Sequence, residues 1–327
     1  MTNLLTDRSG VDRPARRGRN AGDTLADMAE SVTIRTPAKV NLALSVGPPE
    51  PAGTPDAGMH PIASWIAAVD LFDDITLTKA DATTLERHRA DDAPSRSPMG
   101  WLPSDDLTLR ALGKLSAIAE RDLSAKVSIT KRIPVGGGLG GGSSDAAACL
   151  IAANQLFELD LPLNTLVEIA RSLGSDIPFF LDETAKPRPA LVTHFGERIR
   201  RVELGPTELL LILPGFGCHT GDVYREYDQS PLSLDIARVV KMAEAGVVNT
   251  QELFNDLTLP AQRYQAELQT LIARIGRVTD EPIHLSGSGS TLFMVPGDAA
   301  KLAETIGDRI NNVRCAVVRT LTGTEQA

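Results

Sequence analysis

Hydrophobic and polar residues alternate along residues 31–46, which is the two-residue period of a β-strand. Because successive side chains of a strand point to opposite faces, Lys39 and Asn41 are expected to project together from its polar face. Pro37 predicts a bend or a break between the two halves of the strand. On spacing alone, the same pattern fits an edge strand whose polar face meets solvent. The apolar positions of the other parity are Val32, Ile34, Val40, Leu42, Leu44 and Val46.

A run of glycines at residues 136–142, interrupted only at Leu139, joins two patterned segments. Before it, apolar residues at alternate positions of 127–133 predict a strand. After it, apolar residues recur at the spacing of a helix. Glycine lets a ligand approach the backbone closely, and a helix N-terminus attracts anions, so the stretch predicts a phosphate-binding loop rather than a flexible linker. The candidate N-cap residues of this helix are Ser143, Ser144 and Asp145.

Two familiar phosphate loops fit this stretch poorly. A Walker loop ends in Gly-Lys-Ser or Gly-Lys-Thr, and no lysine follows these glycines. The dinucleotide fingerprint G-x-G-x-x-G is met within the run, but it also requires a second strand that ends in an acid about 20 residues further on. The chain instead passes Pro162 into a second predicted helix, for which Thr165-x-x-Glu168 is a candidate capping box. A Rossmann dehydrogenase is therefore the least favoured reading.

Shorter patterns predict the elements around the loop. Upstream, we expect strands at residues 62–71 and 75–78 that meet at Asp73-Asp74, an exposed excursion at 80–104, and a helix at 107–118. Downstream, we expect a fully buried strand at 208–213, mostly helical structure over 231–275, a second glycine loop at 286–290, and then a strand at 292–295, a helix at 299–310 and a strand at 313–321. The turn at Gly205-Pro206 marks the expected boundary between two domains.

Asp176 is a candidate catalytic acid or base. It follows Gly174, which occupies the position of a glycine that ends a helix, and it precedes the apolar residues 177–180. An acid buried in apolar surroundings must be paired or have a raised pKa. An ordinary turn or helix-capping aspartate fits the same position.

Composition narrows the class of protein. The chain has 327 residues, which allows about two domains, and its 42% hydrophobic content supports a sizeable core. The net charge of −9 argues against a nucleic-acid partner or an anionic membrane surface. Cys149, Cys218 and Cys315 are far apart and lack metal-ligand spacing, as in proteins with reduced thiols. Without an apolar run long enough to span a membrane or a signal-peptide core, the sequence predicts a cytoplasmic protein.

Residues 1–30 have a composition of their own. Arginines alternate with acidic residues there, whereas a nucleic-acid arm or a transit peptide would be poorer in acid. We expect a disordered extension, or a true start nearer Met28.

The loop Pro-x-Gly-Gly-Gly-Leu-Gly-Gly-Gly-Ser-Ser-Asp-Ala-Ala, residues 134–147, resembles the ATP loop of the GHMP kinases, which include galacto-, homoserine, mevalonate and phosphomevalonate kinases. Further segments are similar to motifs of one branch of these enzymes, the 4-diphosphocytidyl-2-C-methylerythritol kinases. The resemblance implies an α+β two-domain GHMP kinase fold, with a ribosomal protein S5 domain 2-like α/β domain at residues 31–205 and a ferredoxin-like domain at 206–327. The similar segments are residues 36–42, 173–180, 254–257 and 285–293.

The resemblance also implies an activity: phosphorylation of the 2-hydroxyl of 4-diphosphocytidyl-2-C-methyl-D-erythritol, in the non-mevalonate (MEP) route to isoprenoids, with ATP and Mg²⁺. Asp176 would be the base toward the substrate hydroxyl, and Lys39 its charge partner. Ser144 is a possible Mg²⁺ ligand. The implied substrate contacts are Asn41, His60, Thr220 and Tyr224, the last stacked on the cytosine. The implied triphosphate loop is Pro134, Val135, Gly136, Gly137, Gly138, Leu139, Gly140, Gly141, Gly142, Ser143 and Ser144.

Two positions depart from the pattern of that branch. Met59 precedes His60 where the branch has tyrosine, and Asp106 stands where it has an asparagine near the adenine. A carboxylate cannot donate a hydrogen bond as an amide does. Two other functions stay open: a GHMP kinase for another small alcohol, such as homoserine or a mevalonate-type acid, and a GHMP-fold binding protein without catalysis. The sequence also leaves the choice between a monomer and a homodimer open.

Overall fold

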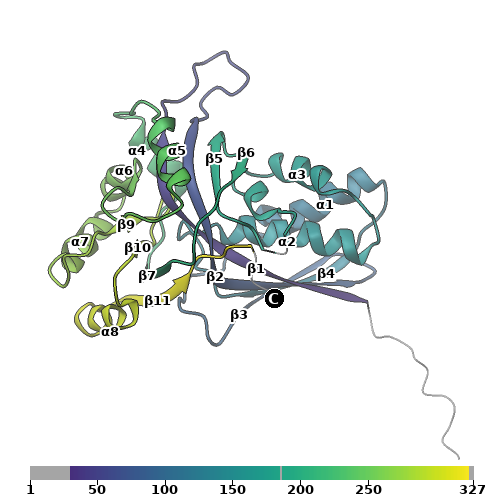
Figure 1. Cartoon of the computed structure of the whole chain (residues 1–327). Coiled ribbons are helices and arrows are strands. Elements are labelled where there is room, and N and C mark those ends of the chain that lie inside the picture. The colour runs from purple at the N-terminus through teal and green to yellow at the C-terminus, as the bar shows by residue number, and fades with distance from the viewer. Residues whose placement is uncertain (1–29, 185, 324–327) are drawn as a thin grey trace, which may run out of the picture.

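The computed structural model describes residues 30–184 and 186–323. Two groups of helices lie on opposite sides of the molecule, with the strands of two β-sheets between them (Figure 1). Within this described part, every helix is too short or too polar to cross a bilayer. Apart from Glu30, the predicted N-terminal extension lies outside the described residues.

The first sheet is built on a long antiparallel pair of strands, β1 (Ser31–Val46) and β2 (Ile62–Lys79). Residues 36–46 of β1 are buried on both faces, so β1 is not an edge strand with a solvated side. The pairing shifts register between Pro37 and Ala38, and the break predicted at Pro37 is therefore an irregularity within one strand. The sheet continues through β3 (Thr84–Arg89), β4 (Ala125–Lys131), β5 (Ala190–His194), β6 (Arg198–Arg201) and β8 (Phe254–Asn255).

Helices α1 (Leu107–Ala119), α2 (Gly141–Leu156) and α3 (Leu163–Arg171) form the group on the right of Figure 1. Helix α2 is the central one and contacts both β1 and β2. Eleven of its 16 residues are buried, and its alanines let the helix backbone lie close to the sheet. Two short 3₁₀ helices, η1 (Pro103–Asp105) and η2 (Ile177–Phe180), complete this half.

The second sheet has the strand order β11 (Val313–Arg319), β7 (Glu208–Pro214), β10 (Leu292–Met294) and β9 (His284–Leu285). The apolar side chains on one of its faces share a core cluster with those of the helices that cover it. These helices are α4 (Thr220–Tyr227), α6 (Thr258–Tyr264), α7 (Ala266–Ile275) and α8 (Ala299–Arg309), whereas α5 (Ile236–Ala245) packs on β1, β2 and β5.

The two halves are closely joined. Strand β8 comes from the C-terminal half but pairs in parallel with β1 of the first sheet. Leu321 N donates to Ala68 O at 2.8 Å, which ties the segment after β11 to β2. One core cluster contains both Trp65 of β2 and Phe293 of β10. The change of sheet falls between β6 and β7, near the predicted boundary at residue 206, and the division into two domains stays a prediction.

The structure corrects four details of the predicted elements. Strand β2 runs without a break through Asp73-Asp74, and the excursion at 80–104 contains the strand β3. Helix α3 starts at Leu163, so Thr165 lies inside its first turn and does not cap it. Helix α2 has Gly140 as its N-cap, so the glycine run itself supplies the first helical residues.

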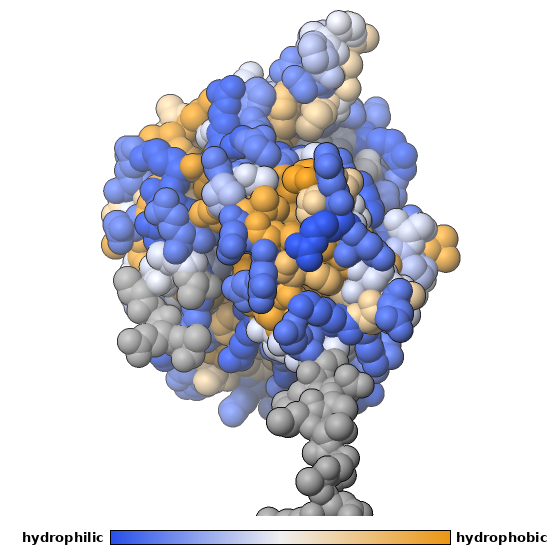
Figure 2. All heavy atoms as spheres, turned by 90° about the vertical axis from the view of Figure 1, so that its right-hand side faces the viewer, coloured by the Kyte–Doolittle hydropathy of each residue, from blue (hydrophilic) through white to orange (hydrophobic). Residues whose placement is uncertain are grey.

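Figure 2 shows the face that lies on the right in Figure 1, where apolar side chains gather in the centre and polar ones surround them. A shallow depression between α1 and α3 is lined by Ala117, Ile118, Ile169 and Leu173. Ile118 is half exposed there, and the other side of α1 packs into the core.

Candidate active site

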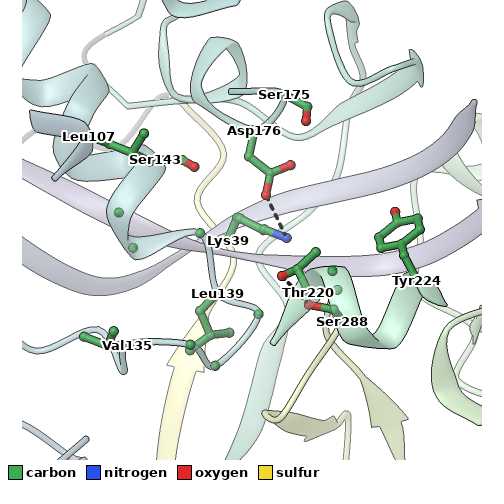
Figure 3. Close-up of a pocket in the computed structure, with 18 of the residues that line it drawn as sticks. Lys39, Leu107, Val135, Leu139, Ser143, Ser175, Asp176, Thr220, Tyr224 and Ser288 are labelled. Atoms are coloured by element: carbon green, nitrogen blue, oxygen red, sulfur yellow. Dashed lines mark hydrogen bonds and ion pairs between the residues drawn. The ribbon is translucent and has the colours of Figure 1, made fainter. Parts of the chain in front are cut away.

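A cavity of about 740 Å³ opens between the two halves of the molecule. Strand β1, the glycine loop, the turn before η2, helix α4 and the second glycine loop all contribute to its walls. The structure therefore brings together segments that are far apart in the sequence (Figure 3). Every predicted site residue except Ser144 lines this cavity.

Lys39 and Asp176 face each other in the middle of the cavity (Figure 3). Lys39 Nζ lies 3.4 Å from Asp176 Oδ2 and donates to Asn41 Oδ1 at 2.5 Å. The Asn41 amide is held in turn, because its Nδ2 donates to Ser64 Oγ at 2.8 Å. The ammonium is thus positioned by its own strand and directed at the carboxylate. Asp176 was expected in buried, apolar company, but its side chain is 39% exposed and open to a ligand.

The glycine loop turns its amide groups toward the cavity. The N–H groups of residues 137–140 have no hydrogen-bond partner among the described residues. Within one peptide unit, the C=O and the N–H that follows it point in opposite directions. The carbonyl groups of this stretch all accept hydrogen bonds from residues on the side of the loop away from the cavity. These carbonyls accept from Cys218 N (Gly136 O, 3.4 Å), Thr291 N (Gly137 O, 3.1 Å), Ser286 Oγ (Gly138 O, 3.1 Å) and Lys39 N (Leu139 O, 2.9 Å).

Glycine is required at Gly138 for a steric reason. Its φ is +75°, and a Cβ placed there would lie 2.1 Å from the carbonyl oxygen of Ser286. The first glycine loop thus packs directly on the second, Ser286 to Ser290. Free N–H groups at the start of α2, together with the helix dipole, make this an anion site.

The two serines at the start of α2 point in different directions. Ser143 lines the cavity, whereas Ser144 is fully buried and its hydroxyl donates to Pro37 O at 2.6 Å. The hydroxyl expected at the phosphates is therefore that of Ser143, and the possible role of Ser144 as a Mg²⁺ ligand does not agree with its position. Adjacent helical residues are about 100° apart around the axis, so the two side chains leave the helix in different directions.

Three of the four predicted substrate contacts, His60, Thr220 and Tyr224, lie toward the other end of the cavity, whereas Asn41 lies beside Lys39. The ring centroids of His60 and Tyr224 are 4.8 Å apart. His60 is fixed by Gly47 O at 3.1 Å from Nδ1 and by Asp228 Oδ1 at 3.3 Å from Nε2. Burial, and next the charge of Asp176, raise the pKa of the Tyr224 phenol, which therefore stays protonated. Thr220 Oγ1 lies 2.9 Å from the Ser288 hydroxyl on the same wall.

A buried charge cluster supports the glycine loop from behind. Lys131, the last residue of β4, places its Nζ 2.5 Å from Asp73 Oδ2 and 2.6 Å from Asp145 Oδ2. Burial raises the pKa of Asp145 to about 8, although the Lys131 ammonium opposes this. The two carboxylates outweigh the effect of burial on the lysine, so the pKa of Lys131 is raised. The cluster ties β2 and β4 to the first turns of α2.

Sequence reasoning missed several residues of the cavity wall. Gly287 and Ser288 lie in a glycine loop that was recognised without a role, and its Ser-Gly-Ser-Gly-Ser composition was the available signal. Lys131 carried no signal, because its partners Asp73 and Asp145 are remote in sequence. Trp101 lay in the excursion that was expected to be exposed, yet it lines the cavity.

Comparisons with known proteins agree with this geometry. The family model of the GHMP kinases N terminal domain matches residues 106–183. A 4-diphosphocytidyl-2-C-methyl-D-erythritol kinase of Streptomyces coelicolor is 34% identical over 307 residues, which cover 90% of this chain and 97% of that protein. One from Chloroherpeton thalassium is 31% identical over 278 residues, which cover 83% of this chain and 91% of that protein.

Solved structures show the same relationship. A crystal structure of a 4-(cytidine 5'-diphospho)-2C-methyl-D-erythritol kinase matches with a TM-score of 0.67 at 28% identity, over 88% of this chain and 99% of that chain. The mevalonate kinase of Methanococcus jannaschii matches with a TM-score of 0.59 at 13% identity, over 90% of this chain and 100% of that chain. The second match shows a shared fold.

Fold and glycine loop together are those of the GHMP kinases, as the motifs predicted, and the Rossmann alternative is wrong. Within the GHMP kinases, the sequence identity to its relatives and the share of each chain that they cover show that the chain belongs to the 4-diphosphocytidyl-2-C-methyl-D-erythritol kinase family. The resemblance inferred from the motifs is confirmed at both levels.

Proposed function

We propose that the chain transfers the γ-phosphoryl group of ATP to the 2-hydroxyl of 4-diphosphocytidyl-2-C-methyl-D-erythritol, in the cytoplasm and within the non-mevalonate (MEP) route to isoprenoid precursors. One observation carries the proposal: the Lys39–Asp176 pair lies in the middle of the cavity, with the glycine loop on one side and the His60–Tyr224 aromatic pair on the other. A cavity of this form suits two nucleotide-bearing ligands that meet at the reacting atoms.

The pair supplies the acid–base chemistry. Asp176 accepts the proton of the substrate hydroxyl while the oxygen of that hydroxyl forms a bond to the γ-phosphorus of ATP. The bond between the γ-phosphorus and the β-phosphate oxygen breaks, and ADP leaves. Lys39, held by Asn41, stabilises the ionised carboxylate before the transfer. The free N–H groups of residues 137–140 stabilise the charge that moves onto the phosphate oxygens.

Mg²⁺ fits the donors of this cavity. The described residues contain no cluster of three His, Cys, Asp or Glu, but kinases bind Mg²⁺ through one or two protein oxygens together with phosphate oxygens and water. The Ser143 hydroxyl, which lines the cavity, is the group here that would hold it. The ion would neutralise phosphate charge when bound.

The aromatic end accounts for the choice of alcohol. Tyr224 and His60 offer ring faces and a polar edge suited to a nucleobase, which homoserine and mevalonate lack. Met59 also lines this end and is 44% exposed, so it supplies a flexible apolar contact in place of a second aromatic ring.

The proposal is tested by ³¹P NMR of reactions with ATP and one alcohol at a time: the diphosphocytidyl substrate, homoserine or mevalonate. We expect a new phosphomonoester signal with the first alone. Tyr224→Leu should raise KM for that substrate at least several-fold and leave KM for ATP unchanged, while Tyr264→Leu, on the surface of α6, should alter neither. Phosphorylation of another alcohol only would overturn the proposed substrate, and absence of any turnover would favour a non-catalytic binding protein.

A further inference from the structure

Trp101 lies in the cavity wall and is fixed by a polar network. It lines the cavity together with Asp106 and Leu107. Its Nε1 donates to Asp106 Oδ2 at 2.8 Å, and Arg87 Nε donates to the same oxygen at 3.2 Å. Arg87 Nη1 also donates to Trp101 O at 3.1 Å. The network therefore holds both the side chain and the backbone of Trp101.

This network leaves one face of the indole for a ligand. The guanidinium carbon of Arg87 lies 4.3 Å from the centroid of the Trp101 ring and covers one face. Asp106 Oδ1 accepts from Thr108 N at 2.9 Å and caps α1. With Trp101, Arg87 and Thr108 as its donors, the buried Asp106 carboxylate is engaged within the chain. The group that this wall offers to a ligand is the half-buried indole.

The part of the cavity wall that contains Trp101 lies where the phosphate donor is expected to bind. Figure 3 shows Leu107 and Ser143 on the opposite side of Asp176 from Tyr224. A triphosphate bound along the glycine loop, with its terminal phosphate at Asp176, places its base on the Leu107 side. Trp101 lines the same cavity and is bonded to Asp106, the neighbour of Leu107.

We infer that Trp101 is the platform on which the base of the phosphate donor stacks, and that Arg87 and Asp106 are positioning residues that hold it. The inference rests on the proposed kinase function. A purine covers more of an indole than a pyrimidine does, so the platform favours ATP over CTP as the donor. The Asp106 carboxylate then holds Trp101 in place and does not contact the base.

Tryptophan fluorescence tests the platform directly, because the chain has two tryptophans and Trp65 is 1% exposed in the core. A non-hydrolysable ATP analogue is titrated into the wild type, Trp101→Phe and Trp65→Phe, while calorimetry records binding independently. We expect the emission to be quenched in the wild type and in Trp65→Phe, but not in Trp101→Phe. Trp101→Leu should raise KM for ATP about two- to tenfold, the range expected of aromatic stacking, with kcat nearly unchanged.

Asp106→Asn tests the positioning role. Whichever way the amide is turned, its NH₂ group faces a donor, either Thr108 N–H or the N–H groups of Trp101 and Arg87. We expect a raised KM for ATP, a nearly unchanged kcat, and a shift of the Trp101 emission to longer wavelength without ligand. A purely structural role would lower the melting temperature and leave the emission of the folded protein as it is.

The outcomes separate this inference from the proposed function. Calorimetric binding of the analogue without a change in Trp101 emission would overturn the platform, even in an active kinase. Quenching by CDP as strong as that by the analogue would also overturn it, because CDP belongs at the Tyr224 end. Quenching by the analogue alone, in a protein that phosphorylates no alcohol, would support the platform and count against the kinase reaction.

Discussion

The Lys39 ammonium lies 3.4 Å from the Asp176 carboxylate, and the two side chains are exposed to very different degrees, 5% and 39%. The buried lysine is fixed by Asn41 and by a strand that is covered on both faces. The aspartate stands on a turn before η2 and reaches into the cavity. We therefore expect Lys39 to act as a fixed charge and Asp176 to be the member of the pair that meets a ligand.

Asp176→Asn should lower kcat by about 10²–10⁴-fold, the usual contribution of a general base. KM for ATP should change little, because the glycine loop proposed to bind the triphosphate does not depend on this side chain. Steady-state kinetics with the diphosphocytidyl substrate give both constants. Glu244→Gln is a suitable control, since Glu244 forms an exposed ion pair with Arg200 and should leave both constants unchanged. A variant with full activity would remove Asp176 from the mechanism.

Gly138→Ala should abolish most activity, since the added Cβ would lie 2.1 Å from Ser286 O and the residue has a φ of +75°. The two glycine loops would have to separate, and the amides of the phosphate loop would lose their alignment. Loss of binding of a non-hydrolysable ATP analogue, measured by calorimetry, is the expected result. Gly113→Ala is the matched control: its Cβ meets nothing within 4 Å, and α1 should gain up to about 1 kcal/mol of stability. Normal nucleotide binding by Gly138→Ala would contradict the proposed packing of the loops.

The glycine loop could be predicted because its signal is local, whereas the pairing of Lys39 with Asp176 came only from the resemblance to a family. Glycine spacing, a strand before it and a helix after it identify a phosphate loop, and alternation in β1 places Lys39 and Asn41 together. The direction of Ser144 could not be predicted, because a shift of one residue in the start of α2 turns each side chain by about 100°. Gly140 rather than a serine caps this helix, and that shift decided which hydroxyl meets the cavity.

Contacts between segments that are far apart in the sequence could not be predicted from it. Asp73 and Asp74 looked like a break between two strands, because buried acids are rare in a sheet. The strand continues since Lys131 pairs with Asp73 and Arg132 pairs with Asp74, at 2.5 and 2.7 Å. Trp101 was placed on the surface because its segment is polar, and its hydrogen bond to Asp106 shows how one side chain can draw a loop toward a cavity.

Lys131→Met should lower the free energy of unfolding by about 3–5 kcal/mol, because it leaves two buried carboxylates without their cation. The loss should grow as pH rises above about 8. Burial already raises the pKa of Asp145 to about 8, and without the ammonium it rises further. Below about pH 8 both folded proteins keep a proton that the unfolded chain has released, but above about pH 8 only the variant does, so only the variant goes on losing stability.

Urea unfolding of the wild type and Lys131→Met at pH 7 and pH 10 measures this effect. Lys126→Met is the matched control. Lys126 lies on the same strand as Lys131 but forms an exposed ion pair with Glu86 of β3, so this variant should show little change at either pH. Adding Asp145→Asn to Lys131→Met should restore part of the stability. Equal losses at both values of pH would contradict the buried charge cluster.

His284 should make the protein less stable in acid. Its ring lies 5.2 Å from that of Phe293, and its Nε2 is buried without a hydrogen-bond partner among the described residues. Burial lowers the pKa of this imidazole from its usual 6.5 to about 4. Between these values the unfolded chain binds a proton that the folded chain does not, so stability is full above pH 6.5 and is lost as pH falls.

His284→Phe removes this proton-binding group and keeps an aromatic ring against Phe293. The wild type should lose about 3 kcal/mol more than the variant between pH 7 and pH 4, which follows from a pKa difference of about 2.5 at 1.36 kcal/mol per unit. Unfolding by urea at several values of pH gives the difference in slope directly. His88→Gln, at an exposed position of β3, should keep the slope of the wild type. If His284→Phe also keeps that slope, the imidazole is protonated in the folded protein, and the acid sensitivity must come from the carboxylates.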